Sequence, residues 1–225
     1  MLRVFMLILL ASTGVAHAAP YDLDPAKSFF TIVTHKQGVG SGLAHDHIIG
    51  TTAVQAKINA DPKQIAATDF EVSFNVKDLK VDDPAYVPKV IDMITSKKIL
   101  EKKPADVSEG DRKTITEDML ADEQLDAKKH PQIKARLLKL VPAPPGDPSI
   151  THMATVSLTI KGKSVDKEFK AEIKPTGDNI SVKAWGAAKF TEFGIEPVSL
   201  FFGAIRNGDE FDILVHFEAR KAKAS

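Results

Sequence analysis

The sequence predicts an all-β fold with a minor α-helical part. Strand patterns fill most of the chain, turn residues separate them, and helical periodicity is confined to residues 87–130. Many strands separated by turns, with little helix, are typical of a β-sandwich or a β-barrel. A closed antiparallel barrel of about eight strands is just wide enough inside to hold one slender ligand. A length of 225 residues favours one domain.

The predicted strands of the first half, 28–35, 47–59 and 69–79, are rich in β-branched and aromatic residues, which favour the strand conformation. Segment 69–79 alternates most clearly, with polar side chains on one face. Its other face carries Phe70, Val72, Phe74 and Val76. Alternation with a period of two indicates a strand that buries one face.

Two segments in the middle of the chain have helical periodicity. In 87–100 and 114–130, apolar residues recur at the spacing of one helix face, and Pro131 ends the second segment. We therefore expect one or two helices inserted mid-chain.

Strand patterns resume after Pro131. They cover 132–140, 179–190 and 210–220, and segment 153–174 reads as two strands that turn at Lys161-Gly162-Lys163. One face of the last strand carries Phe211, Ile213, Val215 and Phe217. The number of predicted strands suits a sandwich or a barrel of about eight.

Residues 1–18 are typical of a cleavable secretory signal peptide. Arg3 precedes an apolar run from Val4 to Leu10, and Ala16-His17-Ala18 matches an A-x-A cleavage pattern. The run is far shorter than the ~20 residues that a membrane-spanning helix needs. We expect cleavage after Ala18 and a single domain, residues 19–225, in the periplasm without stable membrane insertion.

The composition excludes several classes of function. The chain has no cysteine, which excludes thiolate metal sites, thiol redox chemistry and cysteine nucleophiles. Its 30 basic and 30 acidic residues give no electrostatic case for binding nucleic acid. The sequence contains no Gly-x-Ser-x-Gly motif, phosphate-binding loop or dinucleotide fingerprint, so we expect a protein that is not an enzyme. The oligomeric state stays open, a dimer included.

Five motifs occur in an order known from one protein family. YDLDPAKSFFTIVTH (21–35) resembles an opening Tyr-x-Ile-Asp-x-x-x-Ser strand. VSLTIKGKSVDKEFKAEI (156–173) resembles a Gly-x-Leu-Thr-Ile-x-Gly hairpin, and AAKFTEFGIEP (187–197) an Arg-x-Asp-Phe-Gly-Ile segment. Segments 117–136 and 208–220 resemble a helix-then-strand unit and a closing strand. Together they resemble the YceI-like family of periplasmic polyisoprenoid-binding proteins. The resemblance implies a lipocalin-like antiparallel barrel that holds a polyisoprenoid chain in an apolar tunnel.

The chain departs from the family pattern at three places. His130 stands where the family usually has an aromatic residue before the proline. Lys189-Phe190-Thr191-Glu192 stands where the family has Arg-x-Asp before Phe-Gly-Ile. Gly-Leu-Ala-His-Asp-His (42–47) stands where the family has x-Gly-x-Phe, and an Ala-His-Asp-His motif resembles that of one sub-branch. The departures affect the basic and acidic positions, so the identity of the ligand is the part that the resemblance determines least.

The histidines of this motif allow three interpretations. His45 and His47 flank Asp46 and would point to the same face of a strand, and His35 could join them across a hairpin. Imidazole and carboxylate ligands suit Zn, Cu or Fe, so a metal site is one interpretation. A polar turn, in which Asp46 accepts backbone N–H groups, is the second. The third is a polar end of the ligand tunnel, where the imidazoles bind a head group.

We expect a binding protein that holds a long apolar ligand, by resemblance a polyisoprenoid, in the barrel interior as a carrier or in a stress response. Each CH₂ group removed from water contributes ~0.8 kcal/mol, so a long chain binds with few polar contacts. The candidate tunnel residues are Phe29, Phe70, Val72, Phe74, Val76, Trp185, Phe211 and Ile213. The alternative is a metal-binding barrel that holds Zn or Cu through His35, His45 and His47. Apart from a bound isoprenoid lipid or such a metal, we expect no cofactor.

Overall fold

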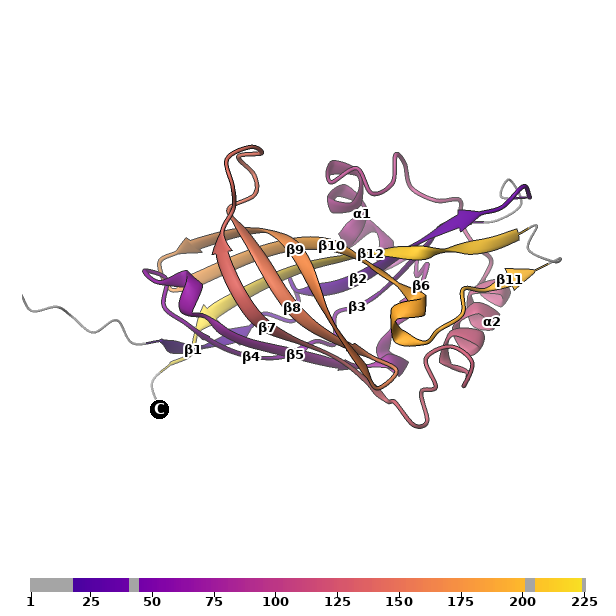
Figure 1. Cartoon of the computed structure of the whole chain (residues 1–225), viewed down its shortest axis with the longest axis horizontal. Coiled ribbons are helices and arrows are strands. Elements are labelled where there is room, and N and C mark those ends of the chain that lie inside the picture. Colours follow the sequence, from indigo (N-terminus) through magenta and orange to yellow (C-terminus); the bar gives the residue numbers. More distant parts are fainter. Residues whose placement is uncertain (1–17, 41–44, 201–204, 224–225) are drawn as a thin grey trace, which may run out of the picture.

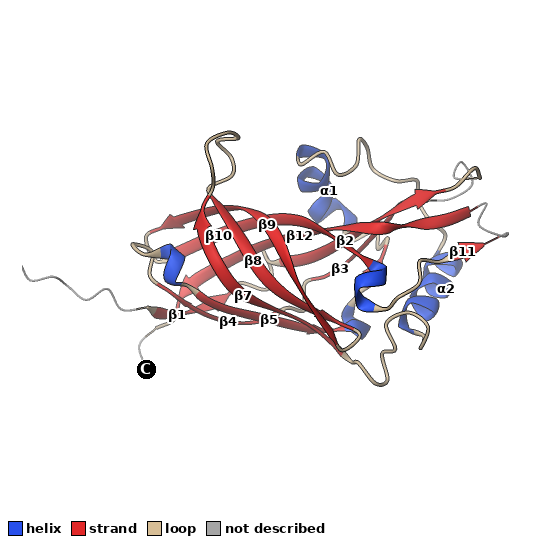
Figure 2. Cartoon of the chain, viewed as in Figure 1, coloured by secondary structure: helices blue, strands red, loops and turns tan. Residues whose placement is uncertain are grey.

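The computed structural model describes residues 18–40, 45–200 and 205–223, which form a closed antiparallel β-barrel with two helices (Figures 1 and 2). The barrel class was one of the two that the strand pattern allowed, and the all-β prediction is confirmed. The predicted signal peptide lies outside the described residues, apart from Ala18. No described helix is long and apolar enough to cross a membrane.

The wall of the barrel follows the order of the chain. Two strands in succession occupy each of its first two places. They are β1 (Ala19–Leu23) and β2 (Phe29–Gln37) in the first, and β3 (His47–Thr51) and β4 (Gln55–Ala60) in the second. The third is β5 (Asp69–Asn75), continued beyond a 3₁₀ turn by β6 (Lys80–Val81). Segments 47–59 and 69–79, each predicted as one strand, are therefore interrupted, and Val76 begins the 3₁₀ helix η3 (Val76–Asp78).

The other wall strands are longer. They are β7 (Gln132–Pro142), β8 (His152–Ile160), β9 (Lys163–Thr176), β10 (Asn179–Lys189) and β12 (Ile205–Lys221). Each pairs antiparallel with its neighbour, and β12 closes the barrel by pairing with both β1 and β2. The short β11 (Ser199–Leu200) pairs with the start of β12. The β8–β9 turn has Lys161 and Gly162 at φ +48° and +74°, which suits a two-residue hairpin turn at the predicted place.

Strand side chains divide between two apolar clusters. The inner cluster fills the barrel and includes Phe30, Ile32, Phe74 and Phe211. The outer cluster lies between the barrel and helix α1 (Val87–Ser96) and includes Phe29, Val33, Ile48, Leu214 and the helix residues Val87, Val90, Met93 and Ile94. Because side chains alternate across a strand, β2 contributes to both clusters.

Tyr86, just before α1, fixes this helix to the barrel wall. Its hydroxyl donates a hydrogen bond to the Phe30 carbonyl oxygen (2.8 Å) and lies 2.7 Å from Thr31 Oγ1. The Tyr86 ring lies directly over Gly50, where a Cβ atom would collide with the ring and hydroxyl. A glycine is therefore required at this point of β3.

Different elements lie at the two ends of the barrel (Figure 1). At one end lies the 3₁₀ helix η2 (Ile65–Ala67), between β4 and β5. At the other lie α2 (Glu109–Leu120) and η4 (Phe190–Phe193). Helix α2 is capped by Ser108, whose Oγ accepts the Asp111 N–H. The helix predicted at 114–130 thus begins earlier and ends at Leu120, and turns follow up to β7.

Candidate ligand-binding cavity

A cavity of about 130 Å³ lies inside the barrel, toward the end where η2 lies. Among the described residues of its lining, Thr68 alone has a polar side chain, and the Thr68 hydroxyl donates to the Ile65 carbonyl oxygen (2.7 Å). The other lining residues are Phe30, Ile58, Ala60, Ile65, Phe70, Val72, Ala135, Leu137, Leu140, Ala154, Val156, Leu158, Phe169, Ala171, Ile173, Ile180, Val182, Ala184, Ile213, Val215, Phe217 and Ala219. The described lining therefore offers a ligand hydrocarbon surface.

Small side chains leave this space open. Six alanines on six strands point into the cavity, where larger residues would fill it. They are Ala60, Ala135, Ala154, Ala171, Ala184 and Ala219. Near the η2 end, the rings of Phe70 and Phe217 lie 5.6 Å apart, centroid to centroid, and form part of the wall.

A second cavity of about 50 Å³ lies toward the end where α2 and η4 lie. Its lining includes Ile32, Ile133 and Phe211 from the strands, Met119 from α2 and Phe193 from η4. Glu192 holds η4 in place, because its carboxylate accepts the Lys189 N–H (2.8 Å) and binds Lys167 Nζ at 2.9 and 3.0 Å. Burial acts to raise the pKa of Glu192, but these hydrogen bonds outweigh burial and lower it. The residues Lys189–Glu192, where the chain departs from the family pattern, thus cap the start of η4.

The structure places most predicted tunnel residues inside the barrel. Phe70, Val72 and Ile213 line the larger cavity and Phe211 lines the smaller one. Phe74 and Val76 belong to the inner cluster.

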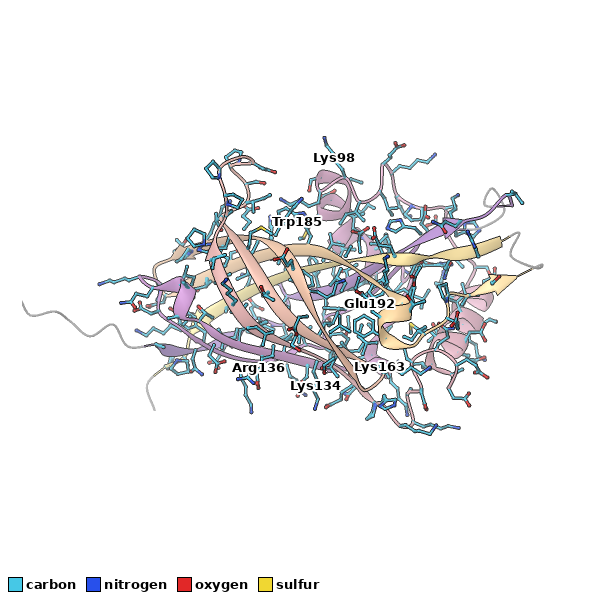
Figure 3. All side chains as sticks on the ribbon, in the orientation of Figure 1. Lys98, Lys134, Arg136, Lys163, Trp185 and Glu192 are labelled. Carbon is cyan, nitrogen blue, oxygen red and sulfur yellow. The ribbon has the colours of Figure 1, made fainter. Side chains whose placement is uncertain are left out.

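Phe29 and Trp185 do not face inward, contrary to the prediction. Phe29 belongs to the outer cluster, and Trp185 packs against that cluster on the α1 side of the wall (Figure 3). Lys97 Nζ is 3.8 Å from the centroid of the Trp185 ring. The reason is the pleat: Phe30 faces inward, so its neighbour Phe29 faces outward, and Trp185 alternates with the inward Ala184 in the same way.

Most of the cavity wall comes from β7 to β10. Of the residues on these four strands, only Trp185 was among the predicted tunnel residues. The signal that could have found it is the same-face spacing of small and apolar residues. On β8 and β9 it runs through Ala154, Val156 and Leu158, then Phe169, Ala171 and Ile173.

The histidines of the Ala-His-Asp-His region lie on different faces. Thr34, not His35, is paired with His47 across β2 and β3, so the side chains of His35 and His47 point to opposite faces. His35 Nε2 binds Asp212 Oδ2 (2.7 Å), whereas His47 Nδ1 binds Asp82 Oδ2 (2.6 Å). The hydrogen bond to Asp212 raises the pKa of His35, although partial burial acts to lower it.

The remaining members of the motif do not complete a metal site. His45 is exposed, and its ring centroid is 6.5 Å from that of His47. Asp46 Oδ1 accepts the Lys36 N–H (2.9 Å), as in the polar-turn interpretation. Within residues 18–40, 45–200 and 205–223, no three His, Asp or Glu side chains are placed to hold one metal ion. The Asp46 contact matches the polar-turn interpretation, and His47 shares a face of the sheet with Thr34, which lines the smaller cavity.

Comparison with known proteins gives a family and a set of similar folds. The family model of the YceI-like domain matches residues 21–219. BcnA of Burkholderia cenocepacia has a similar structure, with a TM-score of 0.59 and 17% identity over 88% of this chain and 99% of that one. A mutant YceI protein of Campylobacter jejuni, crystallised with monobromobimane, has a TM-score of 0.53 and 17% identity over 78% of this chain and 85% of that one.

A polyisoprenoid-binding domain from Saccharophagus degradans is also similar. Its TM-score is 0.50, with 10% identity over 92% of this chain and 100% of that one. No curated protein sequence matches this chain. At these identities the likeness to solved structures supports the fold.

Proposed function

This chain belongs to the YceI-like domain family, and from that premise we propose that it is an exported carrier which holds a long apolar ligand, a polyisoprenoid, inside its barrel. The observation that carries the proposal is the hydrocarbon lining of the larger cavity. A chain without polar groups gains free energy from burial against such a wall, and a polar ligand would lose hydrogen bonds to water. The polyisoprenoid-binding domain with a similar fold supports the choice of ligand class.

Binding, and not catalysis, is the activity that this cavity supports. Catalysis by side chains needs a nucleophile, acid or base within reach of the ligand. The described lining contains one hydroxyl, that of Thr68, and the Ile65 carbonyl oxygen already accepts its proton. We therefore assign the barrel no reaction.

Ligand binding is tested by a substitution that places a larger side chain in the cavity. Ala184 lies on β10 with its side chain in the larger cavity, while Ala187 on the same strand lies on the opposite face. Protein purified from its export compartment is extracted with organic solvent, and the lipid is identified by mass spectrometry. Ala184→Leu should lose most of the bound lipid, and Ala187→Leu should keep it. Wild-type protein that releases no apolar compound and binds no added isoprenol would contradict the proposal.

Export to the periplasm is the second part of the proposal. It is supported by the Arg3, apolar-run and Ala16-His17-Ala18 pattern. Ala19 is the first residue of β1, so cleavage after Ala18 would leave the barrel wall whole. N-terminal sequencing of the protein from the periplasmic fraction should begin at Ala19 or within two residues of it, and an intact Met1 would refute export by this signal.

A further inference from the structure

The two cavities follow one another along the barrel and are separated by one layer of side chains. Inward side chains recur every second residue of a strand. On four strands, one inward residue lines the larger cavity and the next lines the smaller. These pairs are Phe30 and Ile32, Ala135 and Ile133, Leu158 and Ile160, and Ile213 and Phe211. The step between the cavities is therefore one pleat long.

Two aromatic rings lie at this step. The centroids of Phe30 and Phe74 are 4.6 Å apart, with the ring planes tilted by 44°. Phe30 lines the larger cavity, and Phe74 is paired with Ile133, which lines the smaller one. Both side chains are buried within the inner cluster. The ring pair therefore lies at the boundary between the two cavities.

The backbones that carry the two rings have different numbers of paired strands beside them. Phe30 is in the middle of the sheet, paired with Val215 on one side and Thr51 on the other, and its carbonyl oxygen accepts the Tyr86 hydroxyl. Phe74 is paired with β7 alone, because the pairing of β5 with β4 ends at Ser73. Phe74 thus lies beyond the end of the β4–β5 pairing, and its replacement leaves the backbone contact between Phe30 and Tyr86 in place.

We propose that the Phe30–Phe74 pair determines how long an apolar chain the barrel accepts, an inference that rests on the proposed function. An engineered apolar cavity of about 150 Å³ binds benzene. The larger cavity, at 130 Å³, therefore takes the terminal part of a chain whose remainder lies toward η2. The chain end stops at the ring pair, and removal of the Phe74 ring joins the two cavities.

The test measures affinity against chain length. Lipid-free protein is titrated with geraniol, farnesol and geranylgeraniol, in competition with a fluorescent apolar dye. Each methylene that enters the barrel tightens binding about fourfold, so affinity in the wild type should rise with length up to a limit and then level off. In Phe74→Ala the chain length at which affinity levels off should increase. The longer isoprenol should then bind to the variant at least about tenfold more tightly than it binds to wild type.

Phe193→Ala is the matched control. Phe193 is fully buried on η4 and lines the smaller cavity, where its ring centroid is 6.4 Å from that of Phe211. Its loss enlarges that cavity and leaves both rings of the Phe30–Phe74 pair in place. This variant should keep the wild-type limit. If Phe74→Ala does not fold, Phe74→Leu retains most of the apolar volume and should shift the limit in the same direction.

The outcomes separate the two proposals. If wild type binds none of the three isoprenols, the proposed function is overturned and the length rule with it. If wild type binds them and both Phe74 variants show the wild-type limit, only the length rule is overturned.

Discussion

The imidazole of His47 and the carboxylate of Asp82 are joined by a hydrogen bond of 2.6 Å, from Nδ1 to Oδ2. The other carboxylate oxygen of Asp82 accepts the Ile48 N–H at 2.8 Å, and the Asp82 N–H donates to the Ile48 carbonyl oxygen at 2.8 Å. Asp82 has a left-handed backbone, with φ at +46°. One aspartate thus ties the turn after β6 to the start of β3, and the second histidine of the motif has a structural partner.

Replacement of Asp82 by alanine should destabilise the fold by about 1–3 kcal/mol, because it removes the acceptor of a partly buried N–H and of an imidazole. Alanine also fits the left-handed backbone poorly, whereas asparagine tolerates it and retains one acceptor oxygen. Asp82→Asn should therefore lose much less stability than Asp82→Ala. Urea unfolding of the three proteins measures this, and equal losses in both variants would refute the role given to the acceptor.

Added metal should leave the stability of the protein unchanged. His35 and His47 are each bound to a carboxylate on opposite faces of the sheet, so one ion cannot join them in this geometry. A site with a Kd one hundredth of the metal concentration would add about 2.7 kcal/mol and raise the Tm by roughly 5–11 °C. Thermal melts of wild type, His45→Ala and His47→Ala, each with chelator, Zn²⁺ or Cu²⁺, should show no shift of that size. A rise confined to wild type would revive the metal-binding alternative.

The His35–Asp212 pair should make stability depend on pH near neutrality. The hydrogen bond to Asp212 raises the pKa of His35 above its ordinary value of 6.5, and Asp46 and Glu210 add attraction. A raised pKa in the native state means that protonation favours folding. The contribution is complete below about pH 6.5 and disappears as the pH rises through the raised native pKa.

The pair is partly exposed, so the effect should be about 0.2–1 kcal/mol. Free energies of unfolding for wild type and His35→Gln, measured at about pH 5.5 and pH 8.5, give the size and sign. The two proteins should differ more at the lower pH. Asp212→Asn should remove the same dependence, and a difference that grows toward high pH would contradict the assignment.

The sequence was sufficient for the fold class and for one wall of the cavity, because segment 69–79 has one polar and one apolar face. Phe70 and Val72 were therefore assigned to the apolar, buried side, and both line the larger cavity. Segment 29–34 gives no such contrast, since every residue in it is buried. One face of β2 lies under α1 and the other in the barrel, so alternation cannot tell which is inward.

The sequence could not predict which histidines lie on the same face, for a related reason. Spacing shows that His45 and His47 lie two residues apart, but the register of β2 against β3 decides which residue of β2 faces His47. That register places Thr34 there, and a shift by one residue would have placed His35. Asp82 reaches His47 only because β6 returns to pair with β3.

The division into inner and outer faces predicts different effects for two neighbouring aromatic residues. Phe169 on β9 lines the larger cavity, and Trp185 on β10 packs on the outer side with Lys97 over its ring. Phe169→Leu removes ligand contacts and should change isoprenol affinity several-fold. Trp185→Leu loses the packing and the cation–π contact that hold α1, so it should lower stability by about 1–3 kcal/mol without changing affinity. Urea unfolding and the isoprenol titration, applied to both variants, separate the effects. An equal loss of affinity in Trp185→Leu would show that the outer face also contributes to the ligand site.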